Sequence, residues 1–142
     1  MILMIWTIPV TIEEINHRCR NTLADHLGIE FIAIGDEYMT ARMPVDRRTV
    51  QPMGIINGGA SAALAETVAS AAANYCVEKG KVCVGIELNI NHMRSVSGGF
   101  VTATAKPLHR GKTTQVWEIK VVNEAGQLVA AARLTIAVLA KA

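Results

Sequence analysis

One segment, residues 57 to 77, limits the folds open to this chain more than any other. It reads NGGASAALAETVASAAANYCV, and nothing after its two glycines breaks a helix. At 3.6 residues per turn it would form about 30 Å of helix. Small and apolar residues occur on every side of that helix, which is the pattern of a helix surrounded by protein. The rest of the chain must therefore wrap around it.

The segments on either side of this helix contain the strands of a predicted sheet. Residues 82–93, 100–108, 113–122 and 128–139 are rich in Val, Ile and Thr and are separated by glycine-containing turns, which predicts strands, the last three in an antiparallel meander. Before the helix we expect helices over residues 12–20 and 22–26 and strands over 29–34 and 38–43. Thr11 and Glu14 form a capping box for the first of these helices.

These elements predict a single α+β domain, residues 1–142, in which one strongly curved antiparallel sheet wraps around a long central helix. A sheet face left uncovered, or a helix apolar on its far side, would require a second subunit.

Composition argues against several classes of function. A net charge of +2 over 142 residues indicates neither a nucleic-acid surface nor an acidic binder. Cys19, Cys76 and Cys83 form no C-x-x-C pair, which fits buried thiols in a reducing cytoplasm, so we expect a cytoplasmic protein. The four histidines show no metal-binding spacing, so no metal site is expected. The opening MILMIWTIPV lacks a basic start and is too short to span a membrane.

A single carboxylate, Glu66, lies inside the alanine-rich helix. Ser70 and Asn74 follow it at spacings of four, so the three residues share one face, with Thr67 beside them. On such a helix the carboxylate would be partly desolvated, which makes it a stronger base and nucleophile once ionised. The alternative is a surface glutamate, or one paired with an arginine from another element.

Two glycines stand at the start of the same helix. Asn57 is a good N-cap, so Gly58, Gly59 and Ala60 would occupy the first turn with free N–H groups. Glycines there cost about 1–2 kcal/mol of helix propensity, but they let a ligand approach the amides, which could hold a developing oxyanion. Glu66 follows about two turns later, within reach of a carbonyl held near that end if the substrate lies along the helix. The alternative is a tight packing contact between loop and helix.

Three stretches together carry a family resemblance: QPMGIINGGASAALAETVAS, VGIELNINHMRS and KPLHRGKTTQVWEI. They resemble the PaaI-like hotdog-fold acyl-CoA thioesterases, in the branch of the enterobactin proofreading and 1,4-dihydroxy-2-naphthoyl-CoA thioesterases. The resemblance covers nearly the whole chain. It implies a hotdog fold and hydrolysis of a small aryl or acyl thioester of coenzyme A or of an acyl carrier protein, with no cofactor. It also implies a homo-oligomer, commonly a dimer of dimers, with sites between subunits.

The resemblance implies roles for individual residues as well. Glu66 matches the catalytic carboxylate, acting as nucleophile or as general base for water. Gly58 matches the residue whose amide polarises the thioester oxygen, and Gln51 a glutamine that positions the thioester or the attacking water. Ser70 matches a hydroxyl that lies beside the other subunit's glutamate-bearing helix. Positions matching the acyl or coenzyme A side of the site are Gly59, His92, Arg94, His109, Arg110 and Lys112.

The chain departs from the family pattern at Asn57, where the family usually has a histidine that orients or polarises the thioester carbonyl. Asn57 can donate a hydrogen bond from its amide, but it does not titrate near neutral pH. Its role as an N-cap is also sufficient to explain it. We expect the carboxylate mechanism to survive, with an altered rate or substrate preference.

Two other functions stay open. A hotdog hydratase or dehydratase would pair a histidine with an acid across the thioester, and the missing histidine at position 57 argues against it. A non-catalytic acyl-CoA-binding protein would keep the fold and lose the rate.

Overall fold

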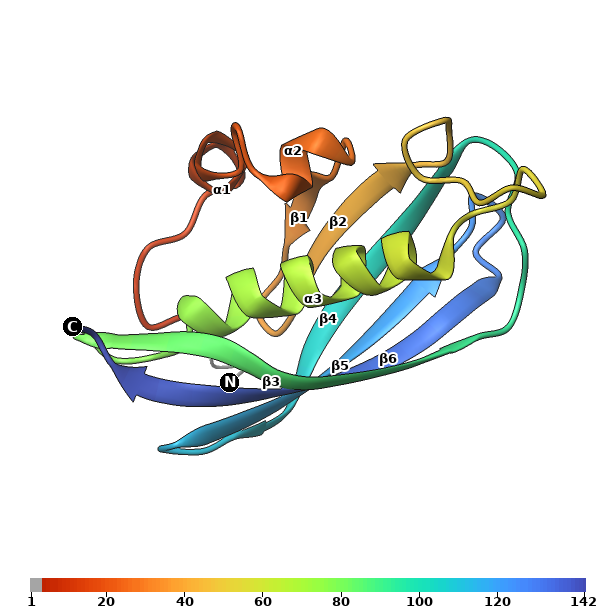
Figure 1. Cartoon of the computed structure of the whole chain (residues 1–142). Coiled ribbons are helices and arrows are strands. Elements are labelled where there is room, and N and C mark those ends of the chain that lie inside the picture. The colour runs from red at the N-terminus through yellow and green to blue at the C-terminus, as the bar shows by residue number, and fades with distance from the viewer. Residues whose placement is uncertain (1–3) are drawn as a thin grey trace.

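In the computed structural model, which describes residues 4–142, a six-stranded antiparallel sheet curves around one long helix (Figure 1). The strand order across the sheet is β1-β2-β4-β5-β6-β3, so β3 forms one edge although it follows the long helix directly in the chain. The predicted architecture is therefore confirmed. The elements are α1 (Ile12–Arg18), α2 (Leu23–His26), β1 (Glu30–Ile34), β2 (Met39–Pro44), α3 (Gly58–Asn74), β3 (Lys81–His92), β4 (Phe100–Arg110), β5 (Thr114–Val122) and β6 (Leu128–Ala140).

The first helix starts where the capping box predicts and ends earlier. The Thr11 hydroxyl accepts a hydrogen bond of 3.1 Å from the Glu14 N–H. The helix stops at Arg18, two residues before the predicted end, because the chain turns at Asn21, whose φ of 60° is left-handed. Asparagine tolerates that conformation better than most residues. The Asn21 N–H is bound by the Asp25 carboxylate, at 3.0 Å.

The central helix α3 ends at Asn74, three residues short of the predicted Val77. Beyond it, the carbonyl groups of Tyr75 and Val77 accept hydrogen bonds from Thr7 in the N-terminal segment. The Asn74 side chain also joins the helix end to the edge strand. It accepts from the Cys83 N–H at 2.8 Å and donates to the Cys83 carbonyl at 3.2 Å. These bonds fix the position of α3 relative to β3.

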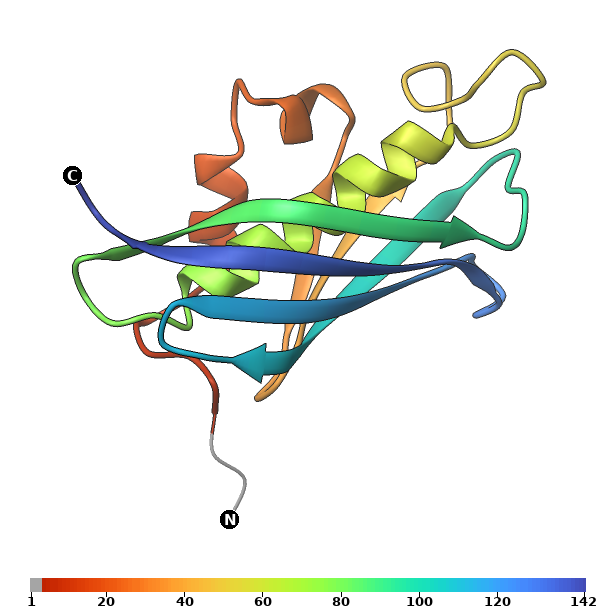
Figure 2. The same ribbon diagram turned by 60° about the horizontal axis from the view of Figure 1, so that its bottom comes forward.

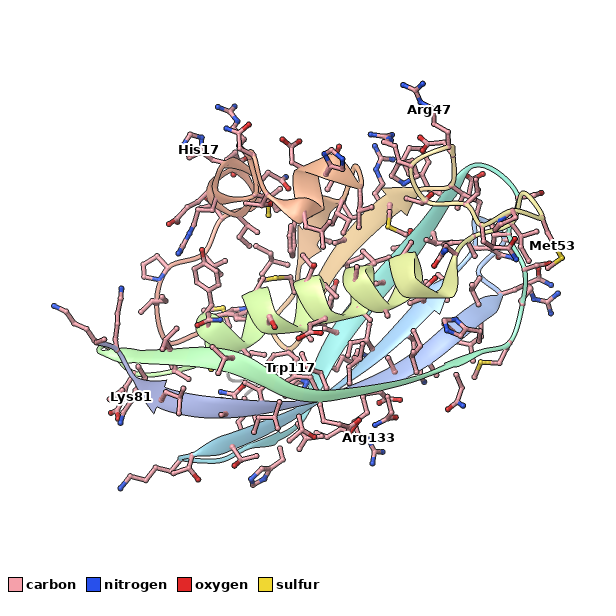
Figure 3. The ribbon with its side chains drawn as sticks, in the orientation of Figure 1. His17, Arg47, Met53, Lys81, Trp117 and Arg133 are labelled. Atoms are coloured by element: carbon pink, nitrogen blue, oxygen red, sulfur yellow. The ribbon has the colours of Figure 1, made fainter. Side chains whose placement is uncertain are left out.

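One face of α3 packs on the concave side of the sheet, which Figure 2 shows from another direction, with β3, β6 and β5 crossing in front of the helix. The Trp117 ring lies in this interface (Figure 3), fully buried, and its Nε1–H donates to Gln115 Oε1 at 2.7 Å. The buried residues of α3 are Ala60, Ser61, Leu64, Ala65, Val68, Ala69, Ala72 and Ala73.

The opposite face of α3 is incompletely covered, which corrects the prediction of a helix surrounded on every side. Gly59 and Glu66 are exposed on this face. The half-buried residues beside them are Ala62, Ala63, Thr67, Ser70, Ala71 and Asn74. We call these eight residues the open face of α3. Most of them are small, as is typical of a helix face that is buried by protein. Within one chain, however, this face is only partly covered.

The β4–β5 hairpin also differs from the prediction. His109 and Arg110 were expected in a turn, but both lie in β4, where they pair with Val116 and Gln115. A bulge between Pro107 and His109 shifts the strand register, and this extra residue lets the strand continue to Arg110. Both side chains are exposed, as expected for His109.

No helix among residues 4–142 is long and apolar enough to cross a membrane. Residues 1–3 of the apolar opening segment lie outside the described residues.

Candidate active site

The start of α3 offers one unbonded amide where the sequence predicted three. Asn57 is the N-cap, and its Oδ1 accepts a hydrogen bond of 2.7 Å from the Gly59 N–H. The Asn57 carbonyl accepts from the N–H groups of Ala60 and Ser61, at 3.0 and 3.2 Å. No acceptor for the Gly58 N–H is found among residues 4–142. Gly58 is therefore the donor that remains for a ligand oxygen.

A histidine lies at this helix start although position 57 is asparagine. His92, the last residue of β3, places its ring so close to Gly58 that a Cβ built there would lie 2.9 Å from Nε2. A side chain at position 58 would therefore have to displace the imidazole. The two residues and Arg94 border a cavity of about 320 Å³, together with Ile55, Ile56, Met93, Ser95 and Val129. Gly58, His92 and Arg94 were all candidates from the sequence, and the fold brings them together.

Gln51 lies in the loop that leads into α3 and is half-buried. Its side-chain Oε1 accepts a hydrogen bond from the Met53 N–H. The backbone N–H of Gln51 donates to the Ile55 carbonyl at 2.8 Å. The Met53 side chain points away from the protein in this loop (Figure 3). With Oε1 engaged, the NH₂ group of Gln51 is the part of the side chain that can donate to a ligand.

Glu66 is exposed on the open face of α3, so the predicted desolvation is absent within a single chain. The reason is that the other elements leave the part of this face around Glu66 open to solvent. The three ion pairs among residues 4–142 join other residues, and the carboxylate makes no side-chain hydrogen bond there. The alternative in which Glu66 pairs with an arginine is therefore not seen among residues 4–142. Ser70 is half-buried one turn later, on the same face.

A second cavity, of about 480 Å³, lies along the open face between α3 and the N-terminal helices. Of its three α3 residues, Thr67 and Ala71 directly follow Glu66 and Ser70 in the chain, and Asn74 is the third. The other lining residues are Ile15, Arg18, Cys19, Thr22, Leu23, Ala24, Tyr75 and Val82. Sequence reasoning missed this cavity because it exists only where α1 and α2 pack over α3.

The cationic candidates divide between the two ends of α3. Arg94 lies at the N-terminal end, whereas Arg110 is close enough to influence the thiol of Cys76, just beyond the C-terminal end. His109 and Lys112 are neighbours of Arg110 on the β4–β5 hairpin. Since α3 has 17 residues, its ends are about 25 Å apart. Within one chain, His109, Arg110 and Lys112 do not line the cavity of His92 and Arg94.

The two buried cysteines do not offer an alternative nucleophile. Burial raises the pKa of the Cys76 thiol to about 12 and that of Cys83 to about 11. Both therefore stay protonated at neutral pH, and a thiol is a far weaker nucleophile than a thiolate. No cluster of three or more His, Cys, Asp or Glu side chains suited to a metal ion is found in residues 4–142.

The N-cap bond gives a prediction for Asn57. Replacing it with alanine should lower the free energy of unfolding by about 1 kcal/mol, because the Gly59 N–H loses its acceptor. Asn57→Asp should retain the cap and the stability. Urea denaturation of the three proteins measures the difference.

The rate of thiol release distinguishes a capping role of Asn57 from a direct role in catalysis. If Asn57 acts as a cap, Asn57→Ala should change the rate of thiol release only a few-fold. A large fall in rate at unchanged stability would show instead that the Asn57 side chain contacts the substrate. Asn57→His tests the departure from the family pattern, because a large gain in rate would mean that asparagine had reduced activity.

Comparison with known proteins identifies the family of the chain. The family model of the thioesterase superfamily matches residues 53–130, which include α3, β3 and the candidate residues Gly58, Glu66 and His92. The proofreading thioesterase EntH of Cronobacter turicensis is 45% identical, and the match covers 96% of this chain and 99% of that protein.

Two solved structures are similar over nearly their full length. A thioesterase from Haemophilus influenzae has a TM-score of 0.95 and 45% identity, with 96% of each chain covered. A mutant thioesterase from Pseudomonas aeruginosa has a TM-score of 0.94 and 44% identity, covering 96% of this chain and 99% of that one. The protein therefore belongs to the thioesterase superfamily and is a thioester hydrolase with the hotdog fold.

Proposed function

We propose that the protein hydrolyses a small aryl or acyl thioester of coenzyme A or of an acyl carrier protein to the free acid and the thiol. Glu66 acts as nucleophile or general base, and the Gly58 N–H is the donor to the thioester oxygen. The observation that carries the proposal is that α3 presents both groups without partners among residues 4–142: an unbonded amide at its start and an unbonded carboxylate on its open face.

The spacing of the two groups argues against the expectation that one chain brings both to the same carbonyl, and it favours a site shared with a second copy of the chain. Gly58 and Glu66 are eight residues apart, which is about 12 Å along the helix axis. A carbonyl group is only about 1.2 Å long, so it does not reach an amide and a carboxylate that far apart. Two antiparallel α3 helices remove the difficulty, because Gly58 of one chain then lies beside Glu66 of the other. Such a dimer has two equivalent sites.

The edge strand β3 supports the same arrangement. It has 12 residues, pairs with β6 on one side only, and exposes Val84 (45%) and Ile86 (64%). A long apolar edge strand is a template for pairing with another chain. We therefore place the second copy against β3 and the open face of α3, where the small side chains permit close approach. The dimer of dimers implied by the family resemblance stays a prediction.

In this dimer the reaction would proceed by one of two routes. The thioester oxygen accepts from Gly58 at the positive end of the helix dipole, and the Gln51 NH₂ group donates to the thioester or to the attacking water. Glu66 then attacks the carbonyl carbon to give an anhydride that water hydrolyses, or it takes a proton from water as the water attacks. In both routes the C–S bond breaks and the thiolate receives a proton. Neither route uses a metal or a redox cofactor.

The two cavities suggest where the rest of the substrate lies. The cavity of about 480 Å³ beside Glu66 and Ser70 has the size of a small-molecule pocket, and we assign it to the acyl group. His92 and Arg94 border the other cavity, which we assign to the thiol side. In this antiparallel pair the Arg110 end of one α3 would lie on the same side of the dimer as the Arg94 end of the other and extend beyond it, so that cations of both chains could meet the coenzyme A phosphates.

Incubation with a panel of thioesters tests the proposal. We expect release of free thiol from benzoyl-CoA, hexanoyl-CoA or the corresponding carrier-protein thioesters, measured with a chromogenic thiol reagent. Crotonyl-CoA should keep its double bond until the thiol is released. A change in the double bond without thiol release would support a hydratase instead. Binding of the thioesters with neither reaction would support a non-catalytic binding protein.

A further inference from the structure

We propose that Gly85 of β3 is a positioning residue for Glu66, because its missing side chain forms the recess in which the carboxylate rests. This inference rests on the proposed function, since it matters only if Glu66 acts on the substrate. Gly85 lies within the edge strand β3, at the place where the Glu66 carboxylate of α3 reaches that strand.

The contact explains why a glycine stands inside a long strand. Glycine weakens a strand, because it has more freedom to lose on folding and no side chain to pack. Gly85 is not among the glycines with a positive φ, so its backbone conformation does not require glycine. Glycine is favoured here by the limited space. A Cβ at Gly85 would overlap Oε2 of Glu66 and would lie 3.3 Å from Leu134 Cδ1.

A break in the strand register lies at the same place. Gly85 pairs with Ile136 of β6 and Glu87 pairs with Thr135, so Ile86 is an extra residue between them. Bulges of this kind bend a strand locally and are common next to active sites. Here the bulge and the glycine adjoin a point at which the Glu66 carboxylate meets β3.

The recess matters because nothing else is seen to hold the carboxylate. Glu66 has no ion-pair partner among the described residues, and its side chain has several rotatable bonds. In the proposed dimer it must meet a carbonyl carbon whose oxygen is fixed by the other chain. A displacement of about 1 Å in such a geometry can lower a rate about 100-fold.

The variant Gly85→Ala tests the inference. The added methyl group would displace the far end of a flexible side chain, with only a small adjustment of Leu134, so the fold should tolerate it. We expect kcat for thiol release from benzoyl-CoA or hexanoyl-CoA to fall about 10- to 100-fold. KM and the thermal unfolding midpoint should stay close to those of the wild type, since the binding groups and the core are unchanged.

Gly98→Ala is the matched control. Gly98 has no positive φ and no atom within 4 Å of a built Cβ, and it is not part of the proposed site, so this variant should keep wild-type kcat. A crystal structure of Gly85→Ala should show the Glu66 carboxylate moved from its wild-type position.

A double variant separates positioning from general damage. In a Glu66→Gln background, Gly85→Ala should cause no further loss of kcat, because there is no carboxylate left to misplace. Wild-type kcat in Gly85→Ala, an equal loss in both backgrounds, or a clear loss of stability would each overturn the inference while leaving Glu66 as the catalyst. Wild-type activity in Glu66→Gln alone would overturn the proposed function, and the role of Gly85 with it.

Discussion

Glu66→Gln is expected to lower kcat/KM for thiol release by about 100- to 10,000-fold, which is the usual contribution of a positioned acid–base group. Glutamine has nearly the same shape as glutamate, but its amide neither attacks a carbonyl carbon nor accepts a proton from water near neutral pH. The free energy of unfolding should not change, because Glu66 is exposed and unpaired among residues 4–142. Steady-state thiol release and urea denaturation of the same protein samples measure the two effects.

Glu78→Gln is the control for this experiment. Glu78 is an exposed glutamate beyond the C-terminal end of α3, so the same chemical change there should leave activity intact. Equal activity in Glu66→Gln and the wild type would rule out Glu66 as the catalyst and favour a different mechanism. A large fall in activity together with unfolding would also contradict the proposed role of Glu66, since the carboxylate contributes no contact on which the fold depends.

Mixing two impaired variants is expected to restore part of the activity. Gln51→Ala removes a donor at the start of α3 and should lower activity about 10-fold or more, whereas Glu66→Gln removes the carboxylate. If each site takes Gln51 and Gly58 from one chain and Glu66 from the other, a mixed dimer contains one site with both parts intact. Random pairing makes half of the dimers mixed, so about a quarter of the wild-type activity should return. Thiol release after subunit exchange measures it.

A second mixture serves as the control. Gln51→Ala combined with the double variant Gln51→Ala/Glu66→Gln forms mixed dimers in the same proportion, but none of their sites is intact. Native mass spectrometry of both mixtures verifies that exchange has occurred. Mixed dimers without recovery of activity would show that each site is built within one chain, and a monomer at assay concentration would refute the shared site altogether.

Local signals carried much of the fold. The Thr11–Glu14 capping box and the Asn57 cap are made by residues close together in the chain, so the sequence predicted both helix starts. The strands of the β4–β5–β6 meander follow one another directly and were predicted for the same reason. The predicted end of α3 was wrong because Thr7, far away in the chain, binds the carbonyl groups beyond it.

The surroundings of the candidate residues were not predictable in the same way. Whether Glu66 is buried depends on β3 being an edge strand, and the order of strands in a sheet is a property of the whole fold. The contact of His92 with Gly58 joins residues 34 positions apart, and no sequence spacing indicates it. The recess at Gly85 has the same origin, because the sequence shows a glycine in a strand but not what lies above it.

The bond between Asn57 and Gly59 has a consequence for product release. Because Asn57 occupies the Gly59 N–H, the helix start offers a single donor and suits a single oxygen. The thioester has one carbonyl oxygen, whereas the acid product is a carboxylate with two oxygens and a negative charge. Only one of its oxygens would find a backbone amide at the helix start, and its charge would face that of Glu66. In the proposed site, repulsion between the acid and the Glu66 carboxylate would oppose the attraction of the helix start for an anion and would favour release of the product.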